Sequence, residues 1–226
     1  NIEILQIPSI EDLSKKVLRI DSLKPISIED LLCRDPIPPN EKLLKEAIEE
    51  KIILITGAGG SIGTELSKQV ARNKPKKIIF LERSEFNLYC LEKEMNERFP
   101  KNMNFYFVLG DILDFRFLKN LVKDMRVNII FHSAAYKHVP LIEKNQLMGI
   151  ENNIIGTLNM CKAAQYESVK KFILISTDKA VRPCNVMGVT KRVSELICMA
   201  FGEQEKIKKI NDPKYKIKRF SMVRFG

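Results

Sequence analysis

Metal-binding patterns are scarce in this chain of 226 residues, which has two histidines and no cysteine pair spaced as a zinc-ligand pair. His132 and His138 have no such cysteine pair near them, so we expect no metal site. The number of cysteines is odd and none stands in a C-x-x-C pair, which argues against a disulfide framework. All lie in apolar stretches, and we expect reduced, buried thiols of a cytoplasmic protein. The cysteines are Cys33, Cys90, Cys161, Cys184 and Cys198.

Long apolar runs are lacking as well. No run reaches the roughly 18 apolar residues that a membrane-spanning helix needs, and no signal peptide is recognisable. The sequence begins with Asn1 rather than methionine and ends at Gly226, directly after an apolar, strand-like run. We therefore interpret it as a fragment of a longer protein.

Acidic residues are fewer than basic ones, and the net charge at pH 7 is +10. Much of the excess lies in two stretches, Lys74–Lys77 and Lys206–Arg219. One interpretation is that these are solvated basic loops, and the other is that they attract an anionic substrate or a membrane surface. No aromatic ladder or nucleic-acid-binding motif accompanies the charge, so we expect no nucleic-acid partner.

From Lys51 onward the sequence contains a regular alternation of short apolar runs and helical patterns. Continuous apolar runs of this length are expected for strands buried on both faces of a parallel sheet. The predicted strands are Ile52–Thr56, Lys77–Glu82, Asn104–Leu109, Asn128–His132, Phe172–Ser176 and Arg219–Arg224. Helices are predicted over about 62–73, 85–98, 114–124, 147–166 and 186–201. The alternation predicts an α/β fold with a Rossmann-type, doubly wound parallel sheet.

Residues 1–50 lack one sustained periodicity and are rich in proline. We expect an irregular arm with short helices there, followed by the main domain at 51–226. Near the end of the arm, Glu41–Lys51 has a helical pattern, and Asn40 is a candidate N-cap.

A glycine-rich turn, TGAGGSIG at Thr56–Gly63, follows the first predicted strand and opens the first predicted helix. An early glycine suits the tight turn, a middle one lets the backbone approach a pyrophosphate, and Gly63 lets helix and strand pack closely. The helix N-terminus offers free N–H groups and a positive dipole end to the phosphates. Because strand, turn and helix come in this order, the motif predicts dinucleotide binding. The residues expected at the cofactor here are Gly57, Gly59, Gly60, Ser61, Ile62 and Gly63.

Acidic residues stand at the ends of the next two predicted strands. Glu82 can accept hydrogen bonds from the adenosine ribose and repels a 2′-phosphate, which favours NAD over NADP. Arg83 and Ser84 follow it and are residue types that can hold a 2′-phosphate, so NADP stays an alternative. Asp111, with Ile112 beside it, is placed to reach the adenine amino group. The alternative role of Asp111 is a helix N-cap, and both roles can hold at once.

The segment HSAAYKHVP at His132–Pro140 follows the fourth predicted strand. Ala134 and Ala135 are small enough for the chain to run close against a flat cofactor. Lys137 and His138 would point from the carboxyl edge of the sheet, where ligands bind in such folds. Taken alone, these two are better explained as a surface lysine and a structural histidine.

Two further motifs carry candidate catalytic side chains. Asp178 and Lys179 end the fifth strand in STDK, as an adjacent acid and base or, without further context, as a solvated turn. Met187 and Lys191 are four residues apart on a predicted helix and therefore share a face. If it faces the cofactor, Lys191 would hold the nicotinamide ribose and lend positive potential.

In this order the motifs resemble the extended short-chain dehydrogenase/reductase superfamily. More narrowly, they resemble the bacterial UDP-N-acetylglucosamine 4,6-dehydratases of polysaccharide and glycan biosynthesis. The resemblance covers about Lys51–Gly226 and rests on TGAGGSIG, HSAAYKHVP, NNIIGT, STDKAVRPCNVMG with TK, and VRFG. The arm segment Ile26–Pro39 resembles the linker of the long, membrane-anchored members. Those members have a transmembrane region before it and a sugar-nucleotide domain after VRFG that this chain lacks.

The resemblance implies a lyase with tightly bound NAD that carries out a redox-neutral dehydration. A hydride leaves sugar C4, water is lost from C5 and C6, and the hydride returns to C6, giving a UDP-4-keto-6-deoxy sugar. Asp178 is then the acid for the leaving hydroxyl, Lys179 the base at C5, and Thr177 a hydrogen-bonding group near the 4-hydroxyl. For this role Lys179 needs partial burial beside other cations. The resemblance further implies that Lys137, His138 and Asn153 contact the substrate.

Met187 departs from most of the superfamily, in which the tyrosine of a Y-x-x-x-K motif occupies this position and acts as the base for C4 oxidation. Methionine cannot take a proton. The long membrane-anchored dehydratases resemble this chain in having methionine there, so the departure favours the narrower assignment. The C4 base stays open between Lys191, Asp178 acting through the substrate, and a water held by Thr177.

Three functions compete at this stage: a retaining 4,6-dehydratase of UDP-N-acetylglucosamine, a UDP-sugar 4-epimerase or inverting 4,6-dehydratase, and a non-catalytic, NAD-sensing module. STDK and Met187 argue against the second, and the Asp178–Lys179 pair argues against the third. The resemblance also implies a cytoplasmic homo-oligomer that meets the inner face of the cell membrane only through segments absent here. Without the C-terminal part, we expect this fragment to bind NAD but to turn over little or no substrate.

Overall fold

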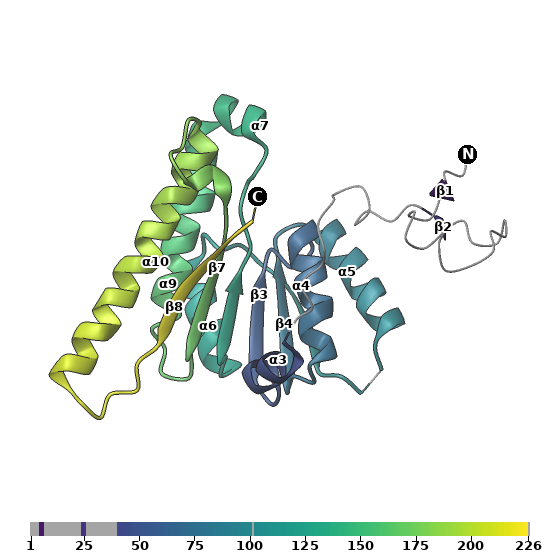
Figure 1. Cartoon of the computed structure of the whole chain (residues 1–226), viewed down its shortest axis with the longest axis horizontal. Helices are drawn as coiled ribbons and strands as arrows, with labels where there is room; N and C mark the ends of the chain where they lie inside the picture. The colour runs from purple at the N-terminus through teal and green to yellow at the C-terminus, as the bar shows by residue number, and fades with distance from the viewer. Residues whose placement is uncertain (1–4, 7–23, 26–39, 101, 226) are drawn as a thin grey trace, which may run out of the picture. The chain divides into compact units, whose positions relative to one another are not determined.

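The computed structural model describes residues 5–6, 24–25, 40–100 and 102–225 (Figure 1). The chain divides into two compact units, of which the first is Asn1–Glu41 and the second Lys42–Gly226. In the first unit, β1 (Leu5–Gln6) pairs antiparallel with β2 (Lys24–Pro25). The short helices expected before residue 40 lie outside the described residues.

Six strands of the second unit form one parallel sheet in the order β5-β4-β3-β6-β7-β8. From β3 the chain adds β4 and then β5 on one side, and it continues with β6 on the other side of β3. This is the strand order of a Rossmann-type fold, and it places a ligand crevice at the carboxyl ends of β3 and β6. Every strand lies within one residue of its predicted bounds, so that prediction is confirmed. The strands are β3 (Ile52–Thr56), β4 (Lys77–Glu82), β5 (Phe105–Leu109), β6 (Ile129–His132), β7 (Lys171–Thr177) and β8 (Arg219–Phe225).

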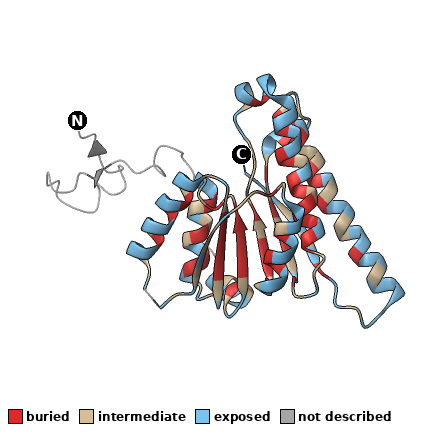
Figure 2. Cartoon of the chain, turned by 180° about the vertical axis from the view of Figure 1, so that it is seen from behind, coloured by how far each residue is buried: buried red, intermediate tan, exposed pale blue. Residues whose placement is uncertain are grey.

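Helices cover both faces of the sheet, and the central strands between them are buried (Figure 2). Because side chains alternate along β3, Ile53 and Ile55 pack on one face with the side chains of α4 and α5. Leu54 points to the other face and packs with residues of α6, α9 and α10. The main helices are α4 (Ser61–Arg72), α5 (Glu85–Arg98), α6 (Phe115–Asp124), α9 (Gly156–Ala163) and α10 (Val186–Asn211).

The helical predictions are confirmed in position but differ in detail. The expected helix at Glu41–Lys51 is α3 and ends at Ile48. A short helix, α7 (Val139–Lys144), was not predicted. The expected helix over 147–166 is divided into α8 (Gln146–Ile150), the π-helical segment η2 (Glu151–Ile155) and α9. In addition, α10 continues ten residues past its predicted end at 201, to Asn211.

The basic stretch Lys206–Arg219 is only partly a solvated loop, because its first turns are helical and two of its lysines serve the fold. They surround the fully buried carboxylate of Glu205. Lys208 Nζ lies 2.7 Å from Glu205 Oε1, and the Lys218 backbone N–H donates to Glu205 Oε2 at 3.1 Å. Tyr215 donates its hydroxyl to the same oxygen at 2.8 Å. The buried acid therefore folds the stretch back onto α10.

The prediction of buried thiols is right for Cys161 and Cys198 and wrong for Cys90 and Cys184, which are exposed. Cys33 lies outside the described residues. In the ranges 40–100 and 102–225, no helix combines the length and the apolar character needed to cross a bilayer.

Candidate functional site

The glycine-rich turn after β3 is shaped by close contacts between backbones. Gly57 has a positive φ of 63°, a conformation that L side chains rarely adopt. A Cβ at Gly63 would lie 2.0 Å from the carbonyl oxygen of Gly57, so only glycine lets α4 start this close to the turn. The N-cap of α4 is Gly60, and no side chain caps it. The first N–H groups of α4 therefore stay available to an anion at the positive end of the helix dipole.

The carboxylate of Glu82, at the end of β4, is fixed by backbone N–H groups. Gly59 donates to Oε2 at 3.0 Å, while Arg83 and Ser84 donate to Oε1 at 2.9 and 3.0 Å. Three donors hold the carboxylate in one orientation next to the glycine-rich turn. Further lone pairs on the carboxylate can still accept hydrogen bonds, as a ribose diol would offer them.

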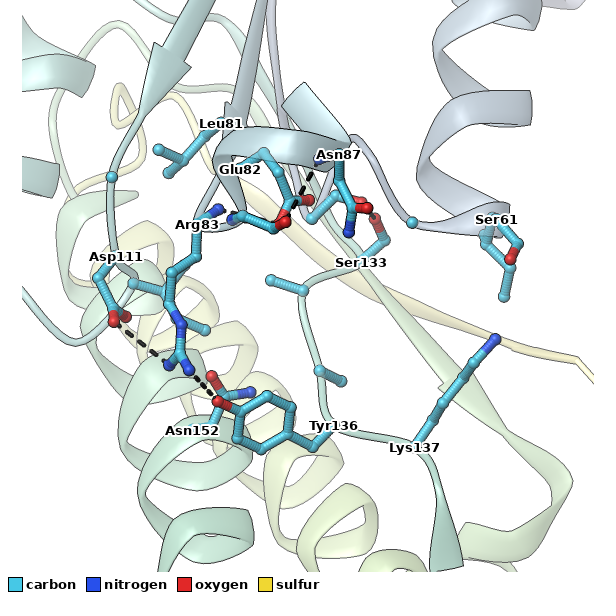
Figure 3. Close-up of a pocket in the computed structure, with 18 residues that line it drawn as sticks. Ser61, Leu81, Glu82, Arg83, Asn87, Asp111, Ser133, Tyr136, Lys137 and Asn152 are labelled. Atoms are coloured by element: carbon cyan, nitrogen blue, oxygen red, sulfur yellow. Dashed lines mark hydrogen bonds and ion pairs between the residues drawn. The ribbon is translucent and has the colours of Figure 1, made fainter. Parts of the chain in front are cut away.

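Arg83 reaches from the end of β4 to residues that follow two other strands (Figure 3). Its Nη1 lies 3.4 Å from Asp111 Oδ2, and its Nη2 donates to the hydroxyl of Tyr136. The guanidinium carbon also lies 5.3 Å from the centre of the Tyr136 ring. Asp111 Oδ1 accepts from the Leu113 N–H at 2.9 Å. Asp111 does not cap α6, whose N-cap is Asp114, so the alternative role considered for Asp111 is wrong.

Together these groups border a cleft of about 430 Å³ at the carboxyl ends of β3, β4 and β6. Most of the predicted cofactor residues line it: Gly57, Gly60, Ser61, Ile62, Glu82, Arg83, Asp111, Ile112, Ala134 and Ala135. Gly59 and Gly63 do not line the cleft but fix the glycine-rich turn through the contacts described above. Lys191 does not line the cleft either. Sequence reasoning missed the lining residues Leu81, Asn87, Gly110, Tyr136 and Asn152. Several of these adjoin predicted residues along the chain, which is a signal that could have found them.

Lys137 and His138 stand where the chain leaves β6, and both are exposed. Lys137 lines the cleft and points toward the side on which Ser61 lies (Figure 3). A second cavity, of about 380 Å³, adjoins the first. Lys137 and His138 line this cavity together with apolar side chains of α7 and α8, among them Leu141 and Met148. Of the two predicted substrate residues, Lys137 lines both cavities and His138 lines the second.

Asn153, in the π-helical segment, is 1% exposed, and protein groups surround its carboxamide. Oδ1 accepts from the Tyr136 N–H at 2.8 Å and from Asn152 Nδ2 at 3.0 Å. Nδ2 donates to the Tyr136 carbonyl and to Thr190 Oγ1, each at 2.9 Å. The amide thereby clamps the cleft-lining segment at Tyr136 to α10. In this arrangement Asn153 positions other groups and has no unused hydrogen-bonding atom to offer a substrate.

The π-helical geometry also leaves the Asn153 carbonyl open to side chains. It accepts from Thr157 Oγ1 at 2.6 Å and from Ser194 Oγ at 2.8 Å. Thr157 in turn lies 3.1 Å from Nε2 of His132, whose Nδ1 is 2.7 Å from Thr56 Oγ1. Burial, together with the nearby charge of Lys191, lowers the pKa of His132 to about 3, so the ring is neutral. This network joins the strand before the glycine-rich turn to α10.

Asp178 and Lys179 follow β7, two strands from β3 at the same edge of the sheet. Lys179 Nζ lies 3.2 Å from Asp178 Oδ1, and Thr177 Oγ1 donates to that oxygen at 3.0 Å. The hydrogen bonds from Thr177 and then Lys179 lower the pKa of Asp178. The side chains of Asp178 and Lys179 are 58% and 52% exposed. The described residues do not supply the burial expected for Lys179.

Met187 and Lys191 share the buried face of α10, as their spacing predicts. Lys191 Nζ donates to the carbonyl of Ile175 in β7 at 2.7 Å, and burial lowers its pKa to about 8. Gly188 brings the start of this helix against the Asp178–Lys179 turn, since a Cβ there would lie 2.4 Å from the Lys179 carbonyl oxygen. The contact of Lys191 Nζ with Ile175 holds its ammonium at β7, and its contact with a cofactor stays a prediction.

One turn beyond Lys191, Glu195 is fully buried and joins α10 to two strands. Ser176 donates to it at 2.8 Å, Arg192 lies 3.0 Å away, and Arg224 of β8 makes two hydrogen bonds at 2.7 and 2.8 Å. These hydrogen bonds, first that of Arg224, lower the pKa of Glu195 to about 2. The charged carboxylate lies one helical turn after Lys191, and its bonds to Ser176 of β7 and Arg224 of β8 hold these two strands together. Sequence reasoning missed it, although its i+4 spacing from Lys191 was available as a signal.

Residues 53–226 match a family model described as polysaccharide biosynthesis protein. The chain is similar to the capsular polysaccharide biosynthesis protein CapD of Staphylococcus aureus, at 39% identity over 89% of this chain and 34% of that protein. It is similar to a UDP-N-acetylglucosamine 4,6-dehydratase (inverting) of Campylobacter jejuni, at 38% identity over 78% of this chain and 48% of that protein. Among solved structures it is similar to Pen from Bacillus thuringiensis, with a TM-score of 0.68 and 31% identity over 79% and 52% of the two chains.

The chain spans about a third to a half of the length of the curated relatives it matches. The part that matches the family model, residues 53–226, contains the parallel sheet except Ile52, the glycine-rich turn and the STDK segment.

Proposed function

This chain belongs to the polysaccharide biosynthesis protein family, and from that premise we propose that it is the NAD-binding part of a nucleotide-sugar 4,6-dehydratase. The proposed substrate is a UDP-N-acetylhexosamine, with UDP-N-acetylglucosamine as the first candidate. The product is a UDP-4-keto-6-deoxy sugar for surface polysaccharide or glycan synthesis. The observation that carries the proposal is the placement of a dinucleotide cleft and the Asp178–Lys179 pair on one edge of one sheet.

The cleft fits a dinucleotide in three respects. The turn at Gly57 and the start of α4 suit a pyrophosphate, because no side chain caps the first N–H groups of α4. Lys137 adds a positive charge on the same side of the cleft. Glu82 is fixed where it can bind ribose hydroxyls, and its charge opposes a 2′-phosphate. These features favour NAD over NADP.

NAD, when bound, would take up a hydride from sugar C4 and give it back at C6. In the proposed reaction Asp178 donates a proton to the leaving 6-hydroxyl and Lys179 removes the C5 proton, which the 4-keto group acidifies. Thr177, already donating to Asp178 at 3.0 Å, stands where it can turn to the 4-hydroxyl. Both roles require side chains that reach the substrate, and the exposure of the pair satisfies that requirement.

In the free chain Asp178 and Lys179 form an ion pair. The proposed roles need the opposite arrangement, in which Asp178 carries a proton and Lys179 does not. We expect the substrate to cause this exchange, because covering the pair removes water and disfavours both charges at once. A proton can then move from Lys179 to Asp178 across their 3.2 Å contact.

The proposal is tested by mass spectrometry of UDP-N-acetylglucosamine after incubation with NAD and the full-length protein that carries this sequence. We expect the loss of one water without accumulation of NADH. An unchanged mass would contradict the dehydratase, and an isomerised sugar of unchanged mass would indicate a 4-epimerase. Proton NMR of the product then distinguishes retention from inversion at C5.

Variants of the pair test its roles. Asp178→Asn and Lys179→Ala should each lower the dehydration rate by at least about a hundredfold, as expected for loss of a general acid or base. The matched controls are Asp124→Asn and Lys123→Ala, which alter another exposed pair of sequence neighbours at the end of α6. Equal activities of the two sets would refute the assignment of Asp178 and Lys179.

A further inference from the structure

The two basic stretches that stand out in the sequence meet at one edge of the sheet. Lys74–Lys77 leads into β4 and Lys206–Arg219 leads into β8. Because the strands are parallel, their amino ends share one edge, opposite to the edge that carries the cleft. Four strand spacings separate β4 from β8, which is about 19 Å. Charges far apart in the sequence therefore form one broad surface.

Residues before the other strands add positive charge to this amino edge of the sheet, which we call the basic edge. Lys51 precedes β3, Arg126 stands three residues before β6, and Lys170 precedes β7, all of them exposed. Within three residues before these strands, the acidic side chains are Glu49 and Glu50. Lysine or arginine thus stands at the start of five of the six strands, all but β5, and positive charge dominates the edge.

The end of α10 and the segment that follows it, residues 206–219, form what we call the basic corner (Figure 1). Besides its lysines, the corner exposes three isoleucines: Ile207 is 56% exposed, Ile210 77% and Ile217 40%. Ile207 lies two residues after the buried Glu205, which is on the opposite side of a helix. Ile210 follows three residues later on that outer face. Large apolar side chains among lysines are typical of surfaces that enter the headgroup region of a membrane.

Internal contacts hold the corner in shape. Glu205 ties Lys208, Tyr215 and the Lys218 backbone together, and Lys218 Nζ donates to the carbonyl of Gln165. These bonds occupy Lys208 and Lys218. Lys206 pairs with Glu203 at 2.6 Å and Lys209 donates to the Pro213 carbonyl, and both side chains stay exposed, as do Lys214, Lys216 and Arg219. The isoleucines and the outer lysines are consequently presented on a folded element, so little conformational entropy is lost when they bind.

We propose that the basic edge, with the basic corner at its end, docks on an anionic lipid bilayer. The lysines would pair with lipid phosphates while Ile207 and Ile210 enter the headgroup layer. A nucleic acid would bind the lysines, but it offers no apolar region that could bury the exposed isoleucines. In residues 206–219 the one aromatic side chain, Tyr215, is bound to Glu205 and does not offer a stacking surface. The bilayer is thus the occupant that matches both the charge and the apolar side chains.

This docking leaves the cleft accessible. The cleft opens at the carboxyl ends of the strands, and strands of this length separate the two edges by about 15–20 Å. A bilayer on the amino edge would therefore face away from the cofactor and the Asp178–Lys179 pair. The proposal goes beyond the dehydratase function and does not depend on it.

The test is sedimentation of the 226-residue chain with vesicles, one set of phosphatidylcholine alone and one with about a third phosphatidylglycerol. We expect binding to the anionic vesicles only, weakened by salt. The charge variant Lys209→Gln/Lys214→Gln/Lys216→Gln should bind on the order of a hundredfold more weakly, at about fivefold per lysine. Its control, Lys93→Gln/Lys119→Gln/Lys144→Gln, loses the same charge from exposed positions outside the basic edge and should bind nearly as the parent.

A second pair of variants tests the apolar contribution. Ile210→Ser should weaken vesicle binding by roughly tenfold, since it removes a buried apolar side chain from the bound state. Its control is Leu147→Ser on α8, because Leu147 is 74% exposed against 77% for Ile210. Circular dichroism confirms that each variant is folded. Equal binding to both vesicle sets, equal loss in the two lysine variants, or tighter binding to duplex DNA with no effect of Ile210→Ser would each overturn the proposal.

Discussion

The two halves of the sheet reach their structures by different means. Among the described residues of 52–125, the buried polar side chains are Thr56 and Ser67, and close backbone contacts at glycines shape the cleft. From His132 onward, buried polar side chains recur through β6, η2, α9, β7 and α10. They are His132, Asn152, Asn153, Thr157, Asn159, Ser176, Thr190, Lys191, Ser194, Glu195, Glu205 and Lys218.

This difference separates two kinds of sensitivity. The first half holds its cleft-lining groups with backbone N–H groups and an apolar core, so its stability should depend little on pH and strongly on added side-chain volume. The second half holds the Asp178–Lys179 turn through buried ionisable and hydrogen-bonding side chains, and the free energy of these contacts depends on protonation. Substitutions that add volume should therefore affect mainly the first half, and changes of pH should affect mainly the second.

The largest expected effect is loss of stability on acidification through His132. Its pKa is about 3 in the folded chain, against the ordinary histidine value of 6.5. Below pH 6.5 the unfolded chain binds a proton that the folded chain does not, so stability falls as the pH drops from about 6.5 toward 3. The whole interval corresponds to about 5 kcal/mol. Urea denaturation at a series of pH values measures it.

The chain supplies a control for this prediction in its other histidine. His132→Gln should remove the decline between about pH 6.5 and 4.5, whereas His138→Gln, at an exposed position, should leave it unchanged. The same slope in the His132 variant as in the parent would show that another group governs acid stability.

The next largest effect comes from Glu195, also in the second half. Its pKa falls from 4.5 to about 2 on folding, so its contribution is complete above about pH 4.5 and is lost as the pH falls toward 2. The shift corresponds to about 3 kcal/mol. Glu195→Gln should lower the free energy of unfolding at neutral pH by about that amount and flatten the curve below pH 4.5. Glu203→Gln, at an exposed glutamate of α10, should change neither, and a parallel loss in both would contradict the role of the buried carboxylate.

The same division explains what sequence reasoning could predict. The strands were predicted within one residue, because a short apolar run bounded by turns is a local signal. The glycine-rich turn and Glu82 were found for the same reason: spacing along the chain fixes their relation. The strands are divided equally between the two halves, and the glycine-rich turn and Glu82 belong to the first, whose structure rests on local backbone geometry.

The second half contains the larger structural features that were missed. In the π-helical segment the Asn153 carbonyl bonds to Thr157 and to Ser194, which is 41 residues away. Near the unpredicted end of α10, Glu205 takes its partners from the segment that returns to β8. The ammonium of Lys191 bonds to the Ile175 carbonyl of β7, a contact that the spacing along the chain does not indicate. Such long-range partners leave no periodic signal in the sequence.

A third prediction concerns the first half and tests its sensitivity to volume. Gly63→Ala places a Cβ 2.0 Å from the Gly57 carbonyl oxygen, and the turn must shift to accept it. We expect dinucleotide affinity to fall at least about tenfold, with roughly 1–3 kcal/mol lost in stability. Titration calorimetry with NADH measures the affinity, and urea denaturation the stability.

The matched control is a glycine of the second half. At Gly202 in α10 a Cβ would lie 3.6 Å from its nearest neighbour, Phe220 Cβ, which is ordinary contact. Gly202→Ala should therefore keep the affinity and raise stability by up to about 1 kcal/mol, because alanine is the better helix former. If Gly63→Ala binds NADH as the parent does, the close packing of turn and helix is not what shapes the cleft.

The smallest expected effect concerns Glu82 in the cleft. Glu82→Gln keeps the shape of the side chain but replaces one acceptor oxygen by an NH₂ group. One of the backbone donors at Gly59, Arg83 or Ser84 then loses its acceptor, and the negative charge that opposes a 2′-phosphate is gone. NADH should bind roughly tenfold more weakly while NADPH binds as well as or better than to the parent, since the charge of Glu82 then no longer opposes the 2′-phosphate. Titration of both cofactors decides the point: a uniform loss for NADH and NADPH would mean that Glu82 only orders the turn, and the preference for NAD would have to come from elsewhere in the cleft.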